Sequence, residues 1–252
     1  SRYPMTKDIE DKLNIGDLHN EEDSRSSRRA IARVSYMAQD RPDVSLPSII
    51  LSQCMANPRT GVTVAIKRVI RYLEAYPRCV HLMKWWVGPP FMDAWADSDW
   101  AGDLATWRST SGGILTWRGC LLLSWARTQR NVSLSSAEAE YCAMTTALQE
   151  GLHARDILIE LGYAEYETEP VHLETDSLGA KQAAEKSGAL HVRHMAIRWH
   201  YVEQRSKEGV AVIHRVTTKE NSADLLTKVM SGPRMNECIT KVKNYDVEKR
   251  AK

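Results

Sequence analysis

The sequence predicts an α/β fold, in which a mixed five-stranded β-sheet is flanked by helices and preceded by a small helical segment. Two observations lead to this prediction. Between residues 91 and 230, three strand-like runs come first, and two further strands then alternate with helical stretches, which is typical of a mixed sheet covered by helices. Before residue 77, apolar residues recur at helical spacing instead. The chain has 252 residues, of which 43% are hydrophobic, so it can bury the core of one large domain or two modest ones.

The composition argues against several classes of protein. The formal net charge is only +2, so the global charge does not indicate a nucleic-acid binder. The five cysteines are scattered and form no C-x-x-C pair, so neither a disulfide framework nor a zinc site is expected, and a reducing compartment is favoured. No apolar run approaches the roughly 18 residues of a membrane span, and the polar N-terminus does not resemble a signal peptide. Because the chain begins with Ser, we expect a piece of a longer polypeptide.

The N-terminal third is expected to be helical after a polar start. Residues 1–27 are rich in charge and serine, which predicts a loop or a poorly ordered segment. Three helices are expected within 28–76: one that ends before Arg41-Pro42, one that starts at Leu46-Pro47, and one with an apolar face. A linker at Gly88-Pro89-Pro90 should close this segment at residue 90.

The remaining elements follow in order up to residue 230. Arg118-Gly119 suits the turn of a hairpin between the second and third strands. The expected strands are 91–97, 112–117, 120–126, 171–175 and 210–216, and the expected helices are 136–161, 177–186, 192–207 and 221–230. The basic tail, 231–252, is expected to be frayed.

Four acidic residues fall at strand ends or helix starts. Asp97 closes the first of these strands and Asp176 follows the fourth, while Glu140 and Asp224 lie in the first turns of two helices. If the first and fourth strands are neighbours, the two aspartates end side by side and the helix starts complete a ring of carboxylates. Such a ring suits Mg²⁺, and two ions roughly 4 Å apart could clamp the oxygens of a phosphodiester. Taken alone, Glu140 or Asp224 could be a partner of the helix dipole, Asp176 could be a helix cap, and Asp97 could belong to a solvated loop.

Several spaced blocks resemble the ribonuclease H domain of copia-type retrotransposon polyproteins. Within residues 93–230 they are DSDWAGDLATWRSTSGGILTW, LLLSWARTQRNVSLSSAEAEYCAM, LETDSLGAKQAA, HVRHMAIRWHYV and ENSADLLTK. Upstream, RPDVSLPSIILSQCM and AIKRVIRYLEAY, within 28–76, resemble the helical end of the reverse transcriptase in the same polyproteins. The acids follow the ribonuclease H order Asp, Glu, Asp, Asp, whereas integrases and DDE transposases have Asp, Asp, Glu.

The resemblance implies an endonuclease that hydrolyses the RNA strand of RNA–DNA hybrids with two Mg²⁺ or Mn²⁺ ions. The metal-binding and catalytic acids of the family match Asp97, Glu140, Asp176 and Asp224. Glu138 is a rival for the helix glutamate, because only one of two residues two apart can face the ring. The implied partners are the hybrid and the rest of the polyprotein, without a membrane. The implied location is intracellular, in cytoplasmic virus-like particles or the nucleus.

The resemblance also implies contacts with nucleic acid. Hydroxyl and basic side chains on two regions could face phosphates or 2′-hydroxyls of the hybrid: Arg108, Ser109, Thr110 and Ser136 on the first, and Arg193, His194 and Arg198 on the second. A polar loop, a helix cap and a plain surface helix are the alternatives. Most of the tryptophans Trp100, Trp107, Trp117 and Trp125 are expected in the core or on the face of the sheet.

The sequence departs from the family in three places. The loop Thr217–Glu220 lacks the histidine that cellular ribonucleases H often carry there, His194 has no acid two residues later, and Lys228-Val229-Met230 stands where Lys-Pro-Leu is typical. No Tyr-x-Asp-Asp motif occurs, so DNA synthesis is not expected. A second hypothesis therefore stays open, in which a degenerate, catalytically silent module only binds nucleic acid or braces a polymerase.

Overall fold

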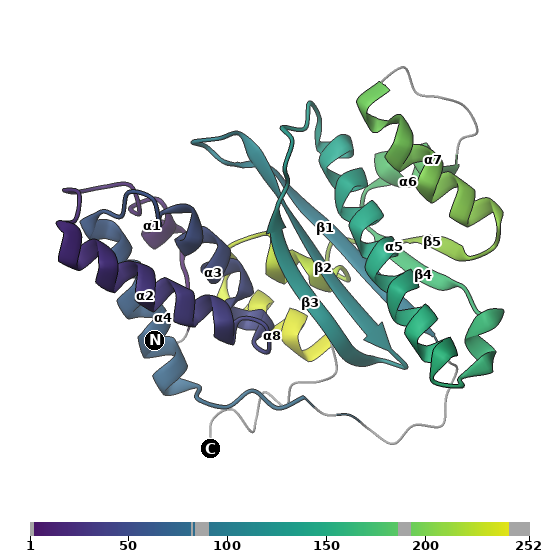
Figure 1. Cartoon of the computed structure of the whole chain (residues 1–252), viewed down its shortest axis with the longest axis horizontal. Helices are drawn as coiled ribbons and strands as arrows, with labels where there is room; N and C mark the ends of the chain where they lie inside the picture. The colour runs from purple at the N-terminus through teal and green to yellow at the C-terminus, as the bar shows by residue number, and fades with distance from the viewer. Residues whose placement is uncertain (1–2, 82, 84–90, 186–192, 242–252) are drawn as a thin grey trace.

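A central β-sheet is covered by helices on both faces, and a helical unit of the N-terminal residues lies to one side of it (Figure 1). The computed structural model describes residues 3–81, 83, 91–185 and 193–241. The strands are β1 (Met92–Asp103), β2 (Arg108–Trp117), β3 (Cys120–Thr128), β4 (Val171–Thr175) and β5 (Ala211–Arg215). The helices are α1 (Lys7–Glu10), α2 (Glu21–Met37), α3 (Pro42–Gln53), α4 (Thr60–Ala75), α5 (Ser136–Glu160), α6 (Leu178–Glu185), α7 (Arg193–Lys207) and α8 (Gly232–Lys241), with 3₁₀ turns η1 (Ala164–Glu167) and η2 (Ser222–Leu226).

The sheet has the strand order β3-β2-β1-β4-β5. The first three strands pair antiparallel, whereas β4 runs parallel to both β1 and β5. The predicted fold class, a mixed five-stranded sheet flanked by helices, is therefore confirmed. The expected adjacency of β1 and β4 is also confirmed, and it brings the carboxyl ends of these two strands to the same edge of the sheet.

The β2–β3 hairpin turns over two residues, as its sequence predicts. Trp117 pairs with Cys120, and Arg118 and Gly119 between them have φ angles of 50° and 71°. Two consecutive positive φ values define a type I′ turn, whose twist matches that of the strands and which favours glycine.

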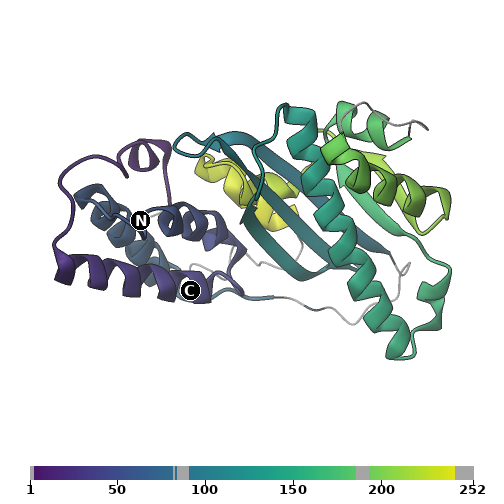
Figure 2. The ribbon, with the colours of Figure 1, turned by 45° about the horizontal axis from the view of Figure 1, so that its top comes forward.

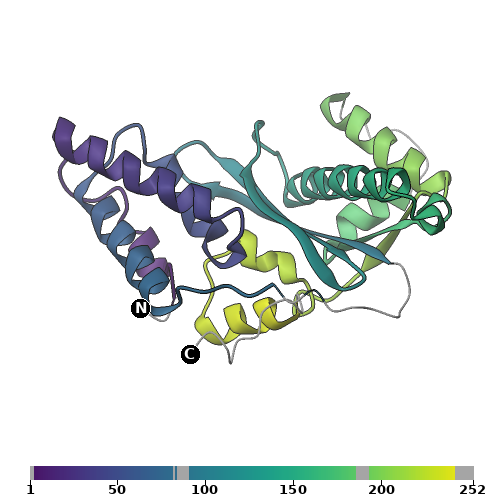
Figure 3. The ribbon, with the colours of Figure 1, turned by 60° about the horizontal axis from the view of Figure 1, so that its bottom comes forward.

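Each face of the sheet is covered by its own helices (Figure 3). On one face, α5 packs against β1 and β2, and buries small residues such as Ala143 and Ala147 against Ala94 and Ala96. On the other face, η2 and α8 contribute Leu226 and other apolar side chains to a second cluster. Burial on both faces explains why β1 and β2 carry so few exposed residues in their central parts.

The helices α1 to α4 form a unit with an apolar core of its own, beside the β3 edge of the sheet (Figure 2). A buried ion pair stabilises this unit from within: Arg41 donates two hydrogen bonds to Asp43 in α3, at 3.0 and 2.8 Å, and the hydroxyl of Tyr72 in α4 donates a third at 2.6 Å. The helix that carries Asp43, α3, also packs against β3 and η2. None of the helices among the described residues is long and apolar enough to cross a membrane.

Three expectations for the N-terminal helices and the C-terminal tail are corrected by the structure. Residues 3–27 are not a loop, since α1 lies there and α2 begins at Glu21, where the Asn20 side chain accepts the Asp23 N–H at 2.8 Å as an N-cap. The second helix begins at Pro42 rather than near Pro47, because a proline fits the first helical position. Residues 232–241 form helix α8, which buries an apolar face, so this part of the expected tail is not frayed.

The last helix of the expected set is shorter than its pattern suggests. Where 221–230 was expected to be helical, only a 3₁₀ turn, η2, forms, and the side chain of Asn221 caps it by accepting the Ala223 N–H. The linker at Gly88-Pro89-Pro90 and the basic residues after Lys241 lie outside the described residues.

Candidate metal centre

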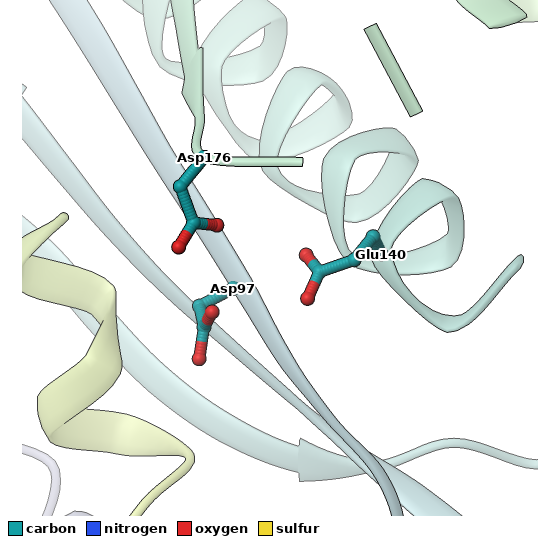
Figure 4. Close-up of side chains that lie close together, drawn as sticks. All are labelled: Asp97, Glu140 and Asp176. Atoms are coloured by element: carbon teal, nitrogen blue, oxygen red, sulfur yellow. The ribbon is translucent and has the colours of Figure 1, made fainter. Parts of the chain in front are cut away.

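Three of the four predicted acids meet at the edge of the sheet. Asp97 lies in β1, Asp176 follows β4 directly, and Glu140 lies in the second turn of α5. One carboxylate oxygen of each lies within 4.8 Å of the others (Figure 4). The parallel pairing of β1 and β4 positions the two aspartates, and the packing of α5 across both strands turns Glu140 toward them.

Burial gives this group of carboxylates an unfavourable electrostatic environment. Asp97 is fully buried and Glu140 is 8% exposed. Burial, followed by mutual repulsion, raises the pKa of Glu140 to about 8. Burial likewise raises the pKa of Asp97 to about 6, although Lys228 and Thr227 act in the opposite direction. A divalent cation would remove this penalty, because it offsets charges that the fold brings together.

One carboxylate oxygen of Glu140, in α5, makes no hydrogen bond within the described part of the chain and could bind a metal ion. Glu140 Oε1 accepts the Ser98 backbone N–H at 3.3 Å, whereas Oε2 is buried and has no hydrogen-bond partner among the described residues. A buried, unpartnered carboxylate oxygen that faces two other carboxylates is suited to bind Mg²⁺, which prefers oxygen ligands. The residues present therefore fit a divalent ion. The acid that the sequence left as a rival, Glu138, instead accepts the Leu134 N–H at 2.8 Å in the first turn of α5.

Asp224 does not join the group of three acids, contrary to the expectation of a single ring. Its carboxylate lies nearby, but Lys228 Nζ donates to its Oδ1 at 2.6 Å and Arg234 donates to its Oδ2 at 3.1 Å. Lys228 Nζ also lies 3.2 Å from Asp97 Oδ1, between the two aspartates. Lys228 follows the 3₁₀ turn η2 and lies four residues after Asp224, a spacing that favours an ion pair on a helical turn.

A glycine makes room for this arrangement. Gly112 in β2 pairs with Asp97 in β1. A Cβ atom at Gly112 would lie 2.7 Å from Thr227 Cγ2 and 2.8 Å from Leu226 Cβ. The absence of a side chain at this position lets Thr227 approach and donate its hydroxyl to Asp97 Oδ2. Sequence analysis did not identify Thr227, Lys228 or Arg234 as site residues. The i,i+4 spacing of Asp224 and Lys228 could have indicated their ion pair, whereas the contacts of Thr227 and Lys228 with Asp97 span 130 and 131 positions and leave no local pattern.

Two other aspartates in β1, Asp99 and Asp103, do not belong to the acidic group. Asp103 accepts the Ala105 N–H at 3.0 Å and the Thr106 hydroxyl, and so caps the turn between β1 and β2. Asp99 lies farther along β1, and burial raises its pKa. Neither belongs to the group of three carboxylates.

The expected nucleic-acid contacts divide into exposed and buried residues. Arg108 and Ser136 are exposed. Ser109 is fully buried and its hydroxyl accepts the Ala101 N–H, while Thr110 is 6% exposed, so burial within the sheet contradicts the expectation that they contact nucleic acid. The helix cap at the start of α5 is Ser135, which accepts the Glu138 N–H.

A polar cavity of about 380 Å³ lies beside α5 and β3. Its lining includes Arg127 and Arg130 from the end of β3 and the loop after it, and Arg198 from α7, which donates to Cys142 Sγ at 2.8 Å. The three arginines make the cavity basic, although Arg127 is paired with Glu150 at 2.7 Å. The sequence predicted that Arg198 contacts nucleic acid, which stays a prediction, and it did not single out Arg127 or Arg130. The side chains of Arg193 and His194 lie outside the described residues.

The tryptophans are less buried than expected. Trp125 is 6% exposed and belongs to the core, and Trp117 is partly buried. Trp100, in β1, is 48% exposed, and Trp107, in the turn between β1 and β2, is 60% exposed. Trp100 therefore lies on the sheet, as expected, although it is not covered, whereas Trp107 is neither in the core nor on the sheet.

Two curated relatives cover most of the chain. The retrovirus-related Pol polyprotein of transposon RE1 of Arabidopsis thaliana is 31% identical over 223 residues, which make up 87% of this chain and 15% of that protein. The polyprotein of transposon RE2 of the same plant is 32% identical over 212 residues, or 83% of this chain and 14% of that protein. The chain is homologous to the Pol polyproteins of copia-type retrotransposons. It spans about 15% of the length of these relatives, and the predicted resemblance is confirmed.

No model of a known protein family matches the sequence. Among solved structures, the LC11-RNase H1 in complex with an RNA/DNA hybrid aligns with 61% of this chain and 99% of its own chain, at a TM-score of 0.41 and 17% identity. The chain thus combines homology to the Pol polyproteins with a module in which three acids meet at the edge of a mixed five-stranded sheet.

Proposed function

We propose that this module hydrolyses the RNA strand of RNA–DNA hybrids and that it uses two divalent ions, Mg²⁺ or Mn²⁺. The observation that carries the proposal is the group of buried Asp97, buried Glu140 and half-buried Asp176, in which Glu140 Oε2 has no partner among the described residues. Bound divalent ions would supply an activated water and stabilise the departing 3′ oxygen of the RNA strand. Asp97 would contact both ions, Glu140 and Asp176 the first, and Asp224 the second.

The chain's own residues have defined tasks in this proposal. The Ser98 N–H and the Thr227 hydroxyl orient Glu140 and Asp97 and keep their remaining oxygens toward the ions. Asn221 Nδ2 bonds the carbonyl oxygen of Ala96 at 2.9 Å and lies 3.5 Å from Asp176 Oδ1, so it holds the ends of β1 and β4 together. The arginine cavity beside α5 would bind backbone phosphates of the hybrid, which fix its position but carry no sequence information.

A silent, nucleic-acid-binding module is the second candidate, and one observation favours it. The gap between Asp97 and Asp224 is already occupied by the Lys228 ammonium group, which resembles a permanent salt bridge. If this contact never opened, only one ion could bind and the module would hold a hybrid without cutting it.

The absence of DNA synthesis by this chain also stays a prediction.

Cleavage of a labelled hybrid separates the two candidates. The purified chain should cut the RNA strand of a short RNA–DNA hybrid with Mg²⁺ or Mn²⁺, and should leave single-stranded RNA and duplex DNA intact. Asp97→Asn and Asp176→Asn should each lower the cleavage rate at least a hundredfold, because each removes an ion ligand. Glu138→Gln serves as the matched control and should cut like the wild type. Cleavage that persists in both aspartate variants, or that is absent from a wild type which binds the hybrid, contradicts the proposal.

A further inference from the structure

Lys228 makes a charge contact with two of the proposed metal ligands, and the proposed function does not explain it. Its Nζ lies 2.6 Å from Asp224 Oδ1 and 3.2 Å from Asp97 Oδ1. Both aspartates are almost completely buried, with side chains 6% and 1% exposed, whereas the lysine side chain is 43% exposed. The ammonium group therefore approaches the acids from the solvent side, on a flexible side chain that can withdraw into water.

The lysine is a lasting positive charge. Burial alone would lower its pKa, but Asp97 and Asp224 outweigh this effect and hold the pKa above its ordinary value. Asp224 keeps a second cationic partner if the lysine withdraws. Arg234 donates to Asp224 Oδ2 and also to the backbone carbonyls of Thr218 and Lys219 at 2.8 Å, so it fixes the aspartate to the loop before η2.

We propose that Lys228 is a tethered counter-cation, which occupies the gap between Asp97 and Asp224 in the metal-free protein and leaves it when a second divalent ion binds there. The reason is competition for the same carboxylate oxygens, since an ammonium and a metal ion cannot both lie between the two acids. The lysine thereby stabilises the fold without metal, and it raises the divalent-ion concentration that the second site requires. This inference rests on the proposed function only in that divalent ions bind the acids, and it does not depend on cleavage.

Binding of Mn²⁺ tests the role of Lys228 without nucleic acid. Free Mn²⁺, measured by electron paramagnetic resonance during a titration, gives the stoichiometry and the affinity of each binding step. We expect two steps for the wild type. In Lys228→Met the second dissociation constant should fall about tenfold, which corresponds to about 1.4 kcal/mol. Lys228→Arg keeps the charge and should stay within about twofold of the wild type. Lys67→Met removes an equal charge from the exposed face of α4 and should change neither step.

Thermal unfolding in EDTA provides a second readout. Lys228→Met should melt at a lower temperature than the wild type in EDTA, and Mn²⁺ should remove the difference, because the ion replaces the lost charge. If the variant folds only with Mn²⁺, the stabilising role is supported directly. If it does not fold at all, Lys228→Gln, which keeps a polar group in the gap, takes its place in both measurements.

Three outcomes would overturn the inference. In the first, the dissociation constant of the second Mn²⁺ ion is unchanged or higher in Lys228→Met. In the second, this constant falls equally in Lys228→Met and Lys228→Arg. In the third, the wild type binds no Mn²⁺. A wild type that binds two ions but cuts no hybrid contradicts the proposed function and leaves the role of the lysine intact. A wild type that cuts hybrids while Lys228→Met binds Mn²⁺ unchanged contradicts the inference alone.

Discussion

Replacing Glu140 by glutamine should stabilise the metal-free protein while it damages the metal centre. The wild-type carboxyl is buried beside Asp97 and Asp176, and its pKa is raised to about 8 from the ordinary value of 4.5. Between these two pH values the folded protein binds more protons at Glu140 than the unfolded chain does. The free energy of unfolding therefore falls as the pH rises through this window. Glutamine does not titrate, and its carbonyl oxygen can still accept the Ser98 N–H.

The size of the effect follows from the same values. One pH unit corresponds to about 1.4 kcal/mol for one proton, so about 3 kcal/mol is lost between pH 4.5 and pH 7 at this buried group. Glu140→Gln should therefore be about 3 kcal/mol more stable than the wild type at pH 7 in EDTA. For a chain of this length that gain corresponds to a melting temperature about 6–12 °C higher. At pH 5 the advantage should fall below about 1 kcal/mol.

Circular dichroism melts at pH 5 and pH 7, with EDTA or with Mg²⁺, test this reasoning. Mg²⁺ should raise the melting temperature of the wild type more than that of Glu140→Gln, which lacks an ion ligand. The matched control is Glu138→Gln, two residues earlier on the same helix, whose amide can still accept the Leu134 N–H. It should stay within about 2 °C of the wild type and keep the full response to Mg²⁺. The reasoning is refuted if Glu140→Gln gains nothing in EDTA or gains equally at both pH values.

Three further substitutions test other parts of the structure. Asp43→Asn should lower the free energy of unfolding by about 3 kcal/mol, because it leaves the buried Arg41 without its charged partner; chemical denaturation measures this, with the exposed Asp40→Asn as control. Gly112→Ala should destabilise the protein by about 1–3 kcal/mol and weaken Mn²⁺ binding, because the added Cβ displaces Thr227 from Asp97; unchanged melting and binding would contradict the close approach described above. Arg130→Ala should weaken hybrid binding, because one phosphate contact is lost. Measured by fluorescence anisotropy, the slope of the logarithm of the association constant against the logarithm of the salt concentration should become about 1 shallower. An unchanged slope would show that Arg130 does not contact the hybrid.

Local sequence rules were sufficient for the sheet and for most of the site. Two strand-like runs and the Arg118-Gly119 turn between them identified the hairpin, and the long helical stretch predicted α5 to within one residue of its end, at Glu160. The position of acids at strand ends predicted that Asp97 and Asp176 meet, because parallel neighbouring strands end at the same edge. These predictions succeeded because each depends on spacing within one element or on one pair of strands.

The missed features depend on geometry that spans the chain. Lys228 and Asp97 are 131 positions apart, and their contact depends on the packing of η2 against β1 and β2. The pattern also predicted a regular helix over 221–230, where only the short 3₁₀ turn η2 forms. The start of α2 was missed for another reason. Asn20 followed by two glutamates is a recognisable capping pattern, but the polar composition of residues 1–27 concealed it.

The charges around the site are distributed unevenly, and this asymmetry predicts the order in which ions bind. Asp224 has two cationic partners, Lys228 and Arg234, so its charge is already compensated without metal. Glu140 has no cation within the ion-pair distance among the described residues, and one of its oxygens is buried without a partner. The first divalent ion should therefore bind on the α5 side, where it relieves the larger penalty. The second ion should bind with a smaller favourable free energy, because it must displace the Lys228 ammonium group, which already compensates the charge between Asp97 and Asp224. In a calorimetric titration, Glu140→Gln should accordingly lack the first binding step. Asp224→Asn should keep the first step and lack the second.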